Sequence, residues 1–376
     1  MHGGDIYSHK IKHDFSININ PLGVPLAAKF AYLRALKKIS NYPDQNCRAL
    51  RAALSKKLDV PAENLVFGNG ASELIQAVIH AVGAKRVLLF APCFTGYERA
   101  VKACGANAVY FYLDEHNDFS LKEADFSRLQ DTFQREKPDF VIFTNPNNPN
   151  GRLFDGQVVE NIIQLCIKYK TKLLLDECFI ELAGAEGAFS FVRKAFGAGQ
   201  GIFIIRAFTK TYAIPGLRLG YCICDSAEPA RALQNQLPEW NVSAVAQKVG
   251  LSLLKTGERY LKKAGALIRR EREYLSKELK ALGFKVYNSD ANFILFKDEI
   301  GGGAQPSQVG EGTSGSVPDT QSQIDAPLPT SLLQKRILIR DCSDFKGLGE
   351  GFYRIAVKRH QENRRLIKAI KRAGRK

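Results

Sequence analysis

Between residues 66 and 225, short runs of apolar, β-favouring residues alternate with amphipathic stretches. The runs span residues 86–90, 107–112, 139–144, 172–176 and 201–206. They are apolar at nearly every position, so we expect strands that are covered on both faces. The stretch 157–170 spaces its apolar residues close to i, i+3, i+4, as a helix does. Together these patterns predict an α/β fold, in which helices cover both sides of a mostly parallel sheet.

The pattern changes after about residue 245, where long basic helical stretches replace the alternation. Shorter strand signals follow at 291–296 and 336–340, which indicates a second, smaller α+β domain. The expected division is an N-terminal arm that also contributes to the small domain, a large domain and a small C-terminal domain, over residues 1–45, 46–245 and 246–376.

One segment of the small domain has an unusual composition. Residues 301–334 contain six glycines but no aromatic residue, no Lys and no Arg. A segment with so few large apolar side chains cannot offset the entropy that is lost on ordering. We therefore expect residues 301–329 to be a flexible surface insertion.

The composition suits a protein with a sizeable core, since 45% of the 376 residues are hydrophobic and 24% are charged. The net charge of +16 would suit nucleic acid, an anionic membrane or a phosphorylated substrate. No apolar run approaches the roughly 20 residues that span a bilayer, and Met1–Asp5 lacks the order of a signal peptide. We expect a soluble, cytoplasmic protein without a membrane partner.

The eight cysteines show neither a disulfide framework nor the paired CxxC spacing of a zinc site. Cys222 and Cys224 alternate with other residues in 219–225, which fits a strand better than a metal pair. We therefore predict a reducing compartment and no metal site.

Four motifs follow predicted strands, where the functional residues of a parallel sheet lie. Gly68–Glu73 opens a helix, so its backbone N–H groups would suit a phosphate, although a tight turn with Ser72 as the N-cap explains it equally well. Residues 144–151 present several asparagine amides. Asp176 follows an aliphatic strand, where a carboxylate needs a cationic partner. Lys210 also follows a strand, where desolvation would activate its amine.

A phosphate cradle, an amide, a buried carboxylate and a Schiff-base lysine in this order describe a site for pyridoxal 5′-phosphate (PLP). The pattern resembles the fold-type-I PLP enzymes of the aspartate aminotransferase superfamily, and within them the branch of histidinol-phosphate aminotransferases and threonine-phosphate decarboxylases. The resemblance covers nearly the whole chain except residues 301–329. It implies the PLP-dependent transferase fold and a homodimer with shared active sites.

The resemblance also implies roles for individual residues. Lys210 would be the catalytic lysine that binds PLP covalently, Asp176 would pair with the pyridine nitrogen, and Asn148 would donate to O3′ of the ring. Phe94 would stack on the ring, and Tyr42 would reach the cofactor phosphate of the neighbouring subunit. The remaining phosphate ligands would be Ala71, Ser72, Thr209 and Arg218.

Substrate-binding residues are likewise implied by the resemblance. Arg354 matches the arginine that binds a substrate carboxylate through a bidentate fork. A second cationic group, assembled from Arg340 and the region of His2 or His9, would bind a phosphate. Without the resemblance, His2 would be a solvated terminal residue and Arg340 a cation at a strand edge. The segments that most resemble threonine-phosphate decarboxylases are residues 2–7, 14–23 and 339–343.

Three positions depart from the usual pattern of these enzymes. Ala207 stands where relatives have Ser or Thr, so one hydroxyl of the phosphate site is lost, and Asn150 replaces a common Thr in a turn. Phe179 stands where aminotransferases have a Tyr that donates to O3′ of the cofactor. The ring oxygen is then less stabilised, and phenylalanine at this position is similar to the decarboxylases of the branch.

The resemblance implies a PLP-dependent lyase that decarboxylates L-threonine O-3-phosphate to (R)-1-amino-2-propanol O-2-phosphate for cobamide (cobalamin) biosynthesis, with serine phosphate as a second candidate substrate. An aminotransferase that acts on histidinol phosphate or a related amino acid is the alternative. A nucleic-acid-binding regulator is a third alternative, suggested by the +16 charge. The basic residues near the C-terminus suit one solvated helix face better, so we expect no nucleic-acid partner.

Overall fold

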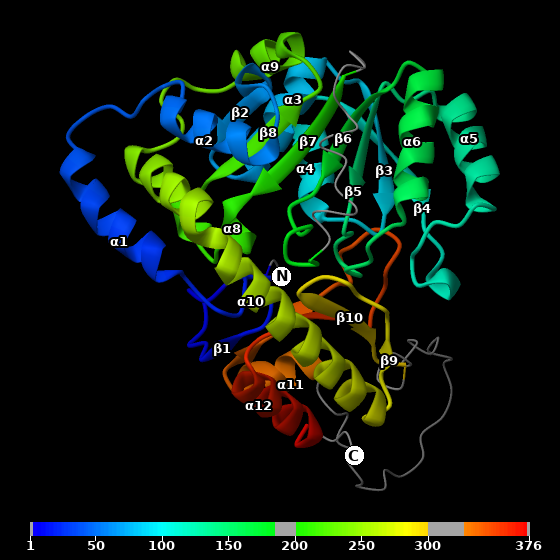
Figure 1. Ribbon diagram of the computed structural model, residues 1–376. Helices are drawn as coiled ribbons and strands as arrows, with labels where there is room; N and C mark the ends of the chain where they lie inside the picture. The colour runs from blue at the N-terminus through cyan, green and yellow to red at the C-terminus, as the bar shows by residue number, and fades with distance from the viewer. Residues whose placement is uncertain (1–2, 185–200, 300–326, 374–376) are drawn as a thin grey trace, which may run out of the picture.

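The computed structural model describes residues 3–184, 201–299 and 327–373, and its main feature is a seven-stranded sheet (Figure 1). The strand order is β2-β8-β7-β6-β5-β3-β4. In that order the strands are Leu65–Gly68, Gly220–Cys224, Ile202–Ala207, Lys172–Asp176, Phe140–Thr144, Arg86–Ala91 and Asn107–Tyr112. Only β8 is antiparallel to its neighbours, and the other neighbouring pairs are parallel. The predicted α/β fold class is confirmed.

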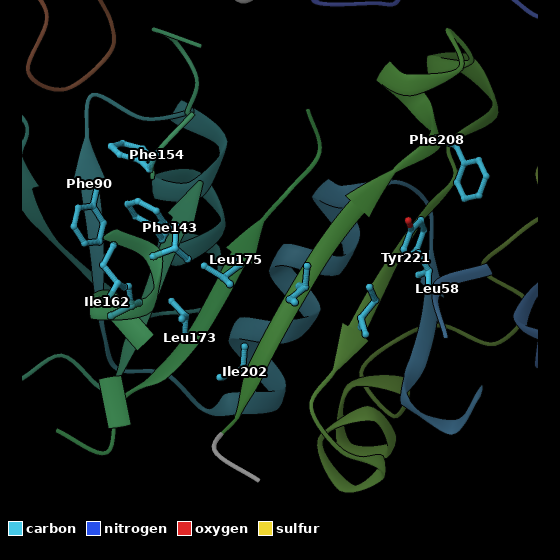
Figure 2. Close-up of a cluster of buried hydrophobic side chains, with 14 of the residues drawn as sticks. Leu58, Phe90, Phe143, Phe154, Ile162, Leu173, Leu175, Ile202, Phe208 and Tyr221 are labelled. Atoms are coloured by element: carbon cyan, nitrogen blue, oxygen red, sulfur yellow. The ribbon is translucent and has the colours of Figure 1, made fainter. Parts of the chain in front are cut away.

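The sheet is buried on both faces, as its uniformly apolar strands predict. In β6, Leu173 and Leu175 belong to one core cluster and Leu174 to another, because successive side chains of a strand point to opposite faces. Figure 2 shows Leu173 and Leu175 in the first cluster with Phe143 and Ile162. Helices α2 (Arg48–Leu58), α5 (Asp125–Glu136) and α6 (Gly156–Lys168) cover that face, and α3 (Ala71–Val82), α4 (Thr95–Ala103) and α9 (Ala227–Gln234) cover the other.

A second, smaller sheet is antiparallel and has the order β12-β13-β10-β9. Its strands are Arg340–Asp341, Phe352–Ala356, Phe293–Lys297 and Lys285–Val286. Helices α11 (Leu328–Gln334) and α12 (His360–Lys371) contribute to the core beside it. Strand β1 (His13–Asp14) pairs in parallel with β11 (Ile337–Leu338), and Phe15 is buried in the same core. The N-terminal segment therefore packs against this part of the molecule.

Helix α10 (Ala244–Ala281) joins the two parts and is 38 residues long. Val249 and Leu253 near its start pack in the core of the large sheet, whereas Leu275 and Leu279 near its end pack in the core of the small sheet. Helix α1 (Leu26–Ala35) lies along the first half of α10 (Figure 1). The remaining helix that bears on function, α8 (Phe208–Thr211), follows β7 directly.

The predicted insertion, residues 301–329, lies outside the described residues apart from its last three. Leu328 and Pro329 already belong to α11, and Leu328 is buried, so the predicted boundary falls two residues inside a helix. None of the helices in the described ranges is long and apolar enough to cross a membrane.

Candidate active site

A cavity of about 340 Å³ opens at the carboxyl ends of the parallel strands. Thr144, Asp176 and Ala207 end β5, β6 and β7, and all three line it. Arg340 of β12 and Arg354 of β13 line it from the small sheet, which lies below the large sheet in Figure 1. The motifs that the sequence places after separate strands thus meet in one cavity, as strand polarity in a parallel sheet requires.

Lys210 lies in the short helix α8 and projects into a desolvated environment. Burial, together with the positive charges of Arg354 and Arg218, lowers the pKa of its amine to about 8. The backbone around it is fixed by Asn20, whose N–H donates to the Lys210 carbonyl (3.1 Å) and whose Nδ2 donates to the Thr211 carbonyl (2.9 Å). A positioned amine that loses its proton this readily is suited to nucleophilic attack on a carbonyl group.

Asp176 is a buried carboxylate held by neutral donors. Tyr97 donates to Oδ2 (2.7 Å) and the Cys178 N–H donates to Oδ1 (2.9 Å). Burial nevertheless raises the pKa of Asp176, and no Lys or Arg in the described part of the chain donates to it. A buried carboxylate without a cation suits a protonated pyridine nitrogen, so this residue fits the predicted cofactor.

Asn148 and Arg354 are joined across the two sheets. Arg354 donates through Nη1 to Asn148 Oδ1 and through Nη2 to the Ser16 carbonyl (2.9 Å). Its Nε is buried without a hydrogen-bond partner, and burial lowers the pKa of Arg354 to about 10. Because Oδ1 of Asn148 already accepts from Arg354, its Nδ2 is the group that remains to donate to a ligand.

The start of α3 lies at another side of the cavity, together with Thr209 and Arg218. The N-cap is Gly70, with φ of 82° and no side-chain cap, so the alternative in which Ser72 caps the helix is wrong. Arg218 donates to the Asn69 carbonyl (3.0 Å), and a Cβ atom on Gly70 would lie 2.7 Å from its Nη2. The first-turn N–H groups of α3 and a guanidinium therefore combine in an anion-binding arrangement that suits the cofactor phosphate.

The aromatic residues predicted at the cofactor ring also line the cavity. Phe94 is the N-cap of α4 and lies edge-on to Tyr97, with ring centroids 5.5 Å apart. Phe179 is buried against Phe293. Asn150 does not line the cavity and instead donates to the Asp118 carbonyl (3.1 Å), so this departure from the family pattern acts on the turn.

The structure gathers most of the predicted site residues but not all of them. Ala71, Ser72 and Arg340 line the cavity, whereas Tyr42 and His9 do not. Tyr42 is 80% exposed and its ring lies tilted against that of Trp240, with ring centroids 4.7 Å apart. The N-terminal segment lines the cavity through Gly3. His2 lies outside the described residues.

Tyr97 and Asn18 are among the cavity residues that the sequence patterns did not indicate. Tyr97 contacts Asp176, and Asn18 is 3% exposed with its Oδ1 buried and without a hydrogen-bond partner. Asn18 lies between Ser16, which accepts from Arg354, and Asn20, which fixes the Lys210 backbone. The polar residues at alternate positions 16, 18 and 20 of an otherwise apolar segment are the signal that would have indicated it.

Comparisons with known proteins agree with this geometry. A model of the family "Aminotransferase class I and II" matches residues 10–370. Threonine-phosphate decarboxylase of Salmonella typhimurium is 32% identical over 95% of this chain and 90% of its own length. The crystal structure of histidinol-phosphate aminotransferase from Clostridium acetobutylicum is 31% identical, covers 96% of this chain and 98% of that chain, and has a TM-score of 0.79.

A second similar structure contains the predicted cofactor. Histidinol-phosphate aminotransferase from Sinorhizobium meliloti, solved in complex with pyridoxal 5′-phosphate, has a TM-score of 0.80 over 96% of this chain and 91% of that chain. At 19% identity this likeness concerns the fold.

Proposed function

The chain belongs to the aminotransferase class I and II family, and from this we propose that it decarboxylates L-threonine O-3-phosphate to (R)-1-amino-2-propanol O-2-phosphate. The product would serve cobamide (cobalamin) biosynthesis in the cytoplasm, and serine phosphate is a second candidate substrate. At the coarser level the chain is a PLP-dependent enzyme, and pyridoxal 5′-phosphate is its cofactor.

The observation that carries the proposal is the pairing of Arg340 with Arg354. The two are direct partners in the register of β12 and β13, so their side chains project from the same face of the small sheet. Both are buried and both line the cavity. Two neighbouring buried cations suit a ligand with two anionic groups, and threonine phosphate has a carboxylate and a phosphate. The likeness to the Salmonella typhimurium decarboxylase supports the same substrate.

When bound, PLP accepts into its ring the electron pair that is left when a bond to the substrate's reacting carbon breaks. Asp176, held by Tyr97, would keep a proton on the ring nitrogen, and Asn148 would donate to the ring oxygen through Nδ2. Lys210 would attach the cofactor. Because the pKa of its amine is about 8, Lys210 would also return a proton to the reacting carbon after carbon dioxide leaves.

The substrate would be held at both ends. Arg354 would bind the carboxylate, and its buried Nε offers a donor that has no partner in the described residues. Arg340 would bind the phosphate, and Asn18 would contribute its amide. Fixing both anionic groups restricts rotation about the reacting carbon, so binding energy from the phosphate would orient the bond to the carboxylate.

We further propose that the enzyme is a homodimer in which Tyr42 reaches the cofactor phosphate of the neighbouring subunit. Tyr42 is exposed in the single chain. Leu26, Phe30 and Leu33 on α1 are also at least 60% exposed, and neighbouring apolar side chains on one surface helix suit a protein interface.

The alternative is an aminotransferase for histidinol phosphate or a related amino acid, which the likeness to the Clostridium acetobutylicum enzyme favours. Both reactions would use Lys210 and Asp176 in the same way. They differ in the bond to the reacting carbon that breaks, and hence in whether carbon dioxide is released.

A comparison of threonine phosphate with threonine tests the two-anion site. Wild-type enzyme should turn over the phosphorylated substrate with far higher kcat/KM, and Arg340→Gln should lose most of that preference. Arg364→Gln, which removes an exposed arginine of α12, should behave as wild type. An Arg340→Gln variant that keeps the full preference would contradict the assignment.

A further inference from the structure

Arg340 is already paired with an acidic residue, Asp344, four positions further along the chain. Asp344 lies in the turn that follows β12, and both of its carboxylate oxygens lie 2.8 Å from Nη2 of Arg340. The Arg340 side chain is only 4% exposed, whereas that of Asp344 is 39% exposed. The ion pair therefore has a buried member that lines the cavity and a solvent-facing member that does not.

This pair offsets a repulsion that the sheet creates. Arg340 and Arg354 are cross-strand partners, and the positive charge of Arg340 is among the causes that lower the pKa of Arg354. Like charges at directly opposed positions destabilise a sheet. Among the described residues, Arg354 donates only to the neutral groups Asn148 Oδ1 and Ser16 O. Two carboxylates, Asp344 and Asp14, act on it electrostatically, and Asp344 is the one that forms an ion pair with Arg340.

A phosphorylated ligand on Arg340 would meet this carboxylate. A phosphate at the guanidinium competes with Asp344 for the same positive charge, and the two anions repel each other. Phe345, the next residue, lines the cavity and lies under the guanidinium, with Arg340 Cζ 5.0 Å from the ring centroid. Two residues of the turn thus contact the guanidinium of Arg340. Phe345 contacts it through an uncharged ring, and Asp344 contacts it through a charged carboxylate.

We propose that Asp344 is a specificity-determining residue that weakens the binding of phosphate at Arg340. This inference rests on the proposed function. Both threonine phosphate and its decarboxylation product carry the phosphate, so a site that bound this group too tightly would retain the product. Because Asp344 and the phosphate compete for the positive charge of Arg340, the phosphate is bound more weakly and the product can dissociate. Arg354 binds the carboxylate, which only the substrate has.

The test is the affinity of the holoenzyme for inorganic phosphate, measured by isothermal titration calorimetry at low ionic strength. With PLP bound, the phosphate site at α3 is filled, so the probe reports on Arg340. Asp344→Asn keeps the shape of the side chain and one hydrogen-bond acceptor but removes the negative charge. The dissociation constant of this variant for inorganic phosphate should be roughly fivefold lower than that of wild type, as expected for one partly exposed charge pair. Asp344→Glu, which keeps the charge, should resemble wild type.

Asp341→Asn is the matched control, because Asp341 ends β12 just before the same turn and its Oδ1 accepts from the Ser343 N–H (2.9 Å). Asp341→Asn also removes one negative charge. An equal gain in phosphate affinity in both variants would therefore show a general charge effect and overturn the proposal. Weaker phosphate binding in Asp344→Asn would also overturn it, because Asp344 would then only orient Arg340. Failure of the proposed function is a separate result, namely wild-type enzyme that releases no carbon dioxide from threonine phosphate.

Discussion

The hydroxyl of Tyr97 donates a 2.7 Å hydrogen bond to Oδ2 of Asp176, although 79 residues separate the two in the sequence. Tyr97 in turn accepts from Thr144 Oγ1 (2.9 Å). These neutral donors orient the carboxylate without neutralising it, so its charge remains to stabilise a cation in the cavity.

Asp176→Asn should lower turnover by about a hundredfold or more, because an amide cannot hold a proton on the ring nitrogen. Tyr97→Phe keeps the carboxylate and removes one hydrogen bond, so its loss should be much smaller. Steady-state kinetics of the two variants, with the visible absorption of bound PLP as a control for occupancy, measures the difference. Near-normal turnover in Asp176→Asn would show that this carboxylate is not the partner of the ring.

Lys210→Ala should abolish both activity and the covalent attachment of PLP, since Lys210 is the amine that lines the cavity beside Asp176 and Asn148. Lys172→Ala, at the exposed start of β6, should leave both unchanged. Borohydride reduction of wild-type protein followed by peptide mapping identifies the modified lysine. A pyridoxyl group on another lysine would overturn the site assignment.

The rate at which cofactor-free protein attaches PLP should rise with pH and level off above a midpoint near 8. The neutral amine is the nucleophile, and burial lowers the pKa of Lys210 from 10.5 to about 8, so the reactive form appears at lower pH than in an ordinary lysine. Arg354→Gln removes a positive charge that contributes to this shift, and its midpoint should lie higher. A wild-type midpoint near 10.5 would contradict the desolvated environment.

Asn18→Asp should raise the KM for threonine phosphate by about tenfold or more, because it places a carboxylate where an anionic ligand binds. Asn18→Ala removes the amide without adding charge and should have a smaller effect. Asn107→Asp, at the exposed start of β4, is the control for added charge. Equal KM values in Asn18→Asp and wild type would show that Asn18 does not contact the substrate.

Much of the fold follows from local pattern, and much of the site does not. The strands were predictable because both their faces are buried, and Asp176 and Lys210 could be found because each follows such a strand. The contact between Tyr97 and Asp176 depends on how α4 packs on the large sheet, and the pairing of Arg340 with Arg354 depends on strand register. Neither contact can be predicted from the spacing of residues along the chain.

One local interpretation also failed for a physical reason. Ser72 is not the N-cap of α3, because Gly70 takes that position with a backbone conformation that favours glycine. The backbone conformation of the folded chain decided the outcome there.

The most direct test of the proposed function is the product formed when the holoenzyme is incubated with threonine phosphate, with and without 2-oxoglutarate. We expect one molecule of carbon dioxide for each substrate consumed, at a rate that 2-oxoglutarate does not change. Glutamate formed in place of carbon dioxide would contradict decarboxylation and establish the aminotransferase alternative.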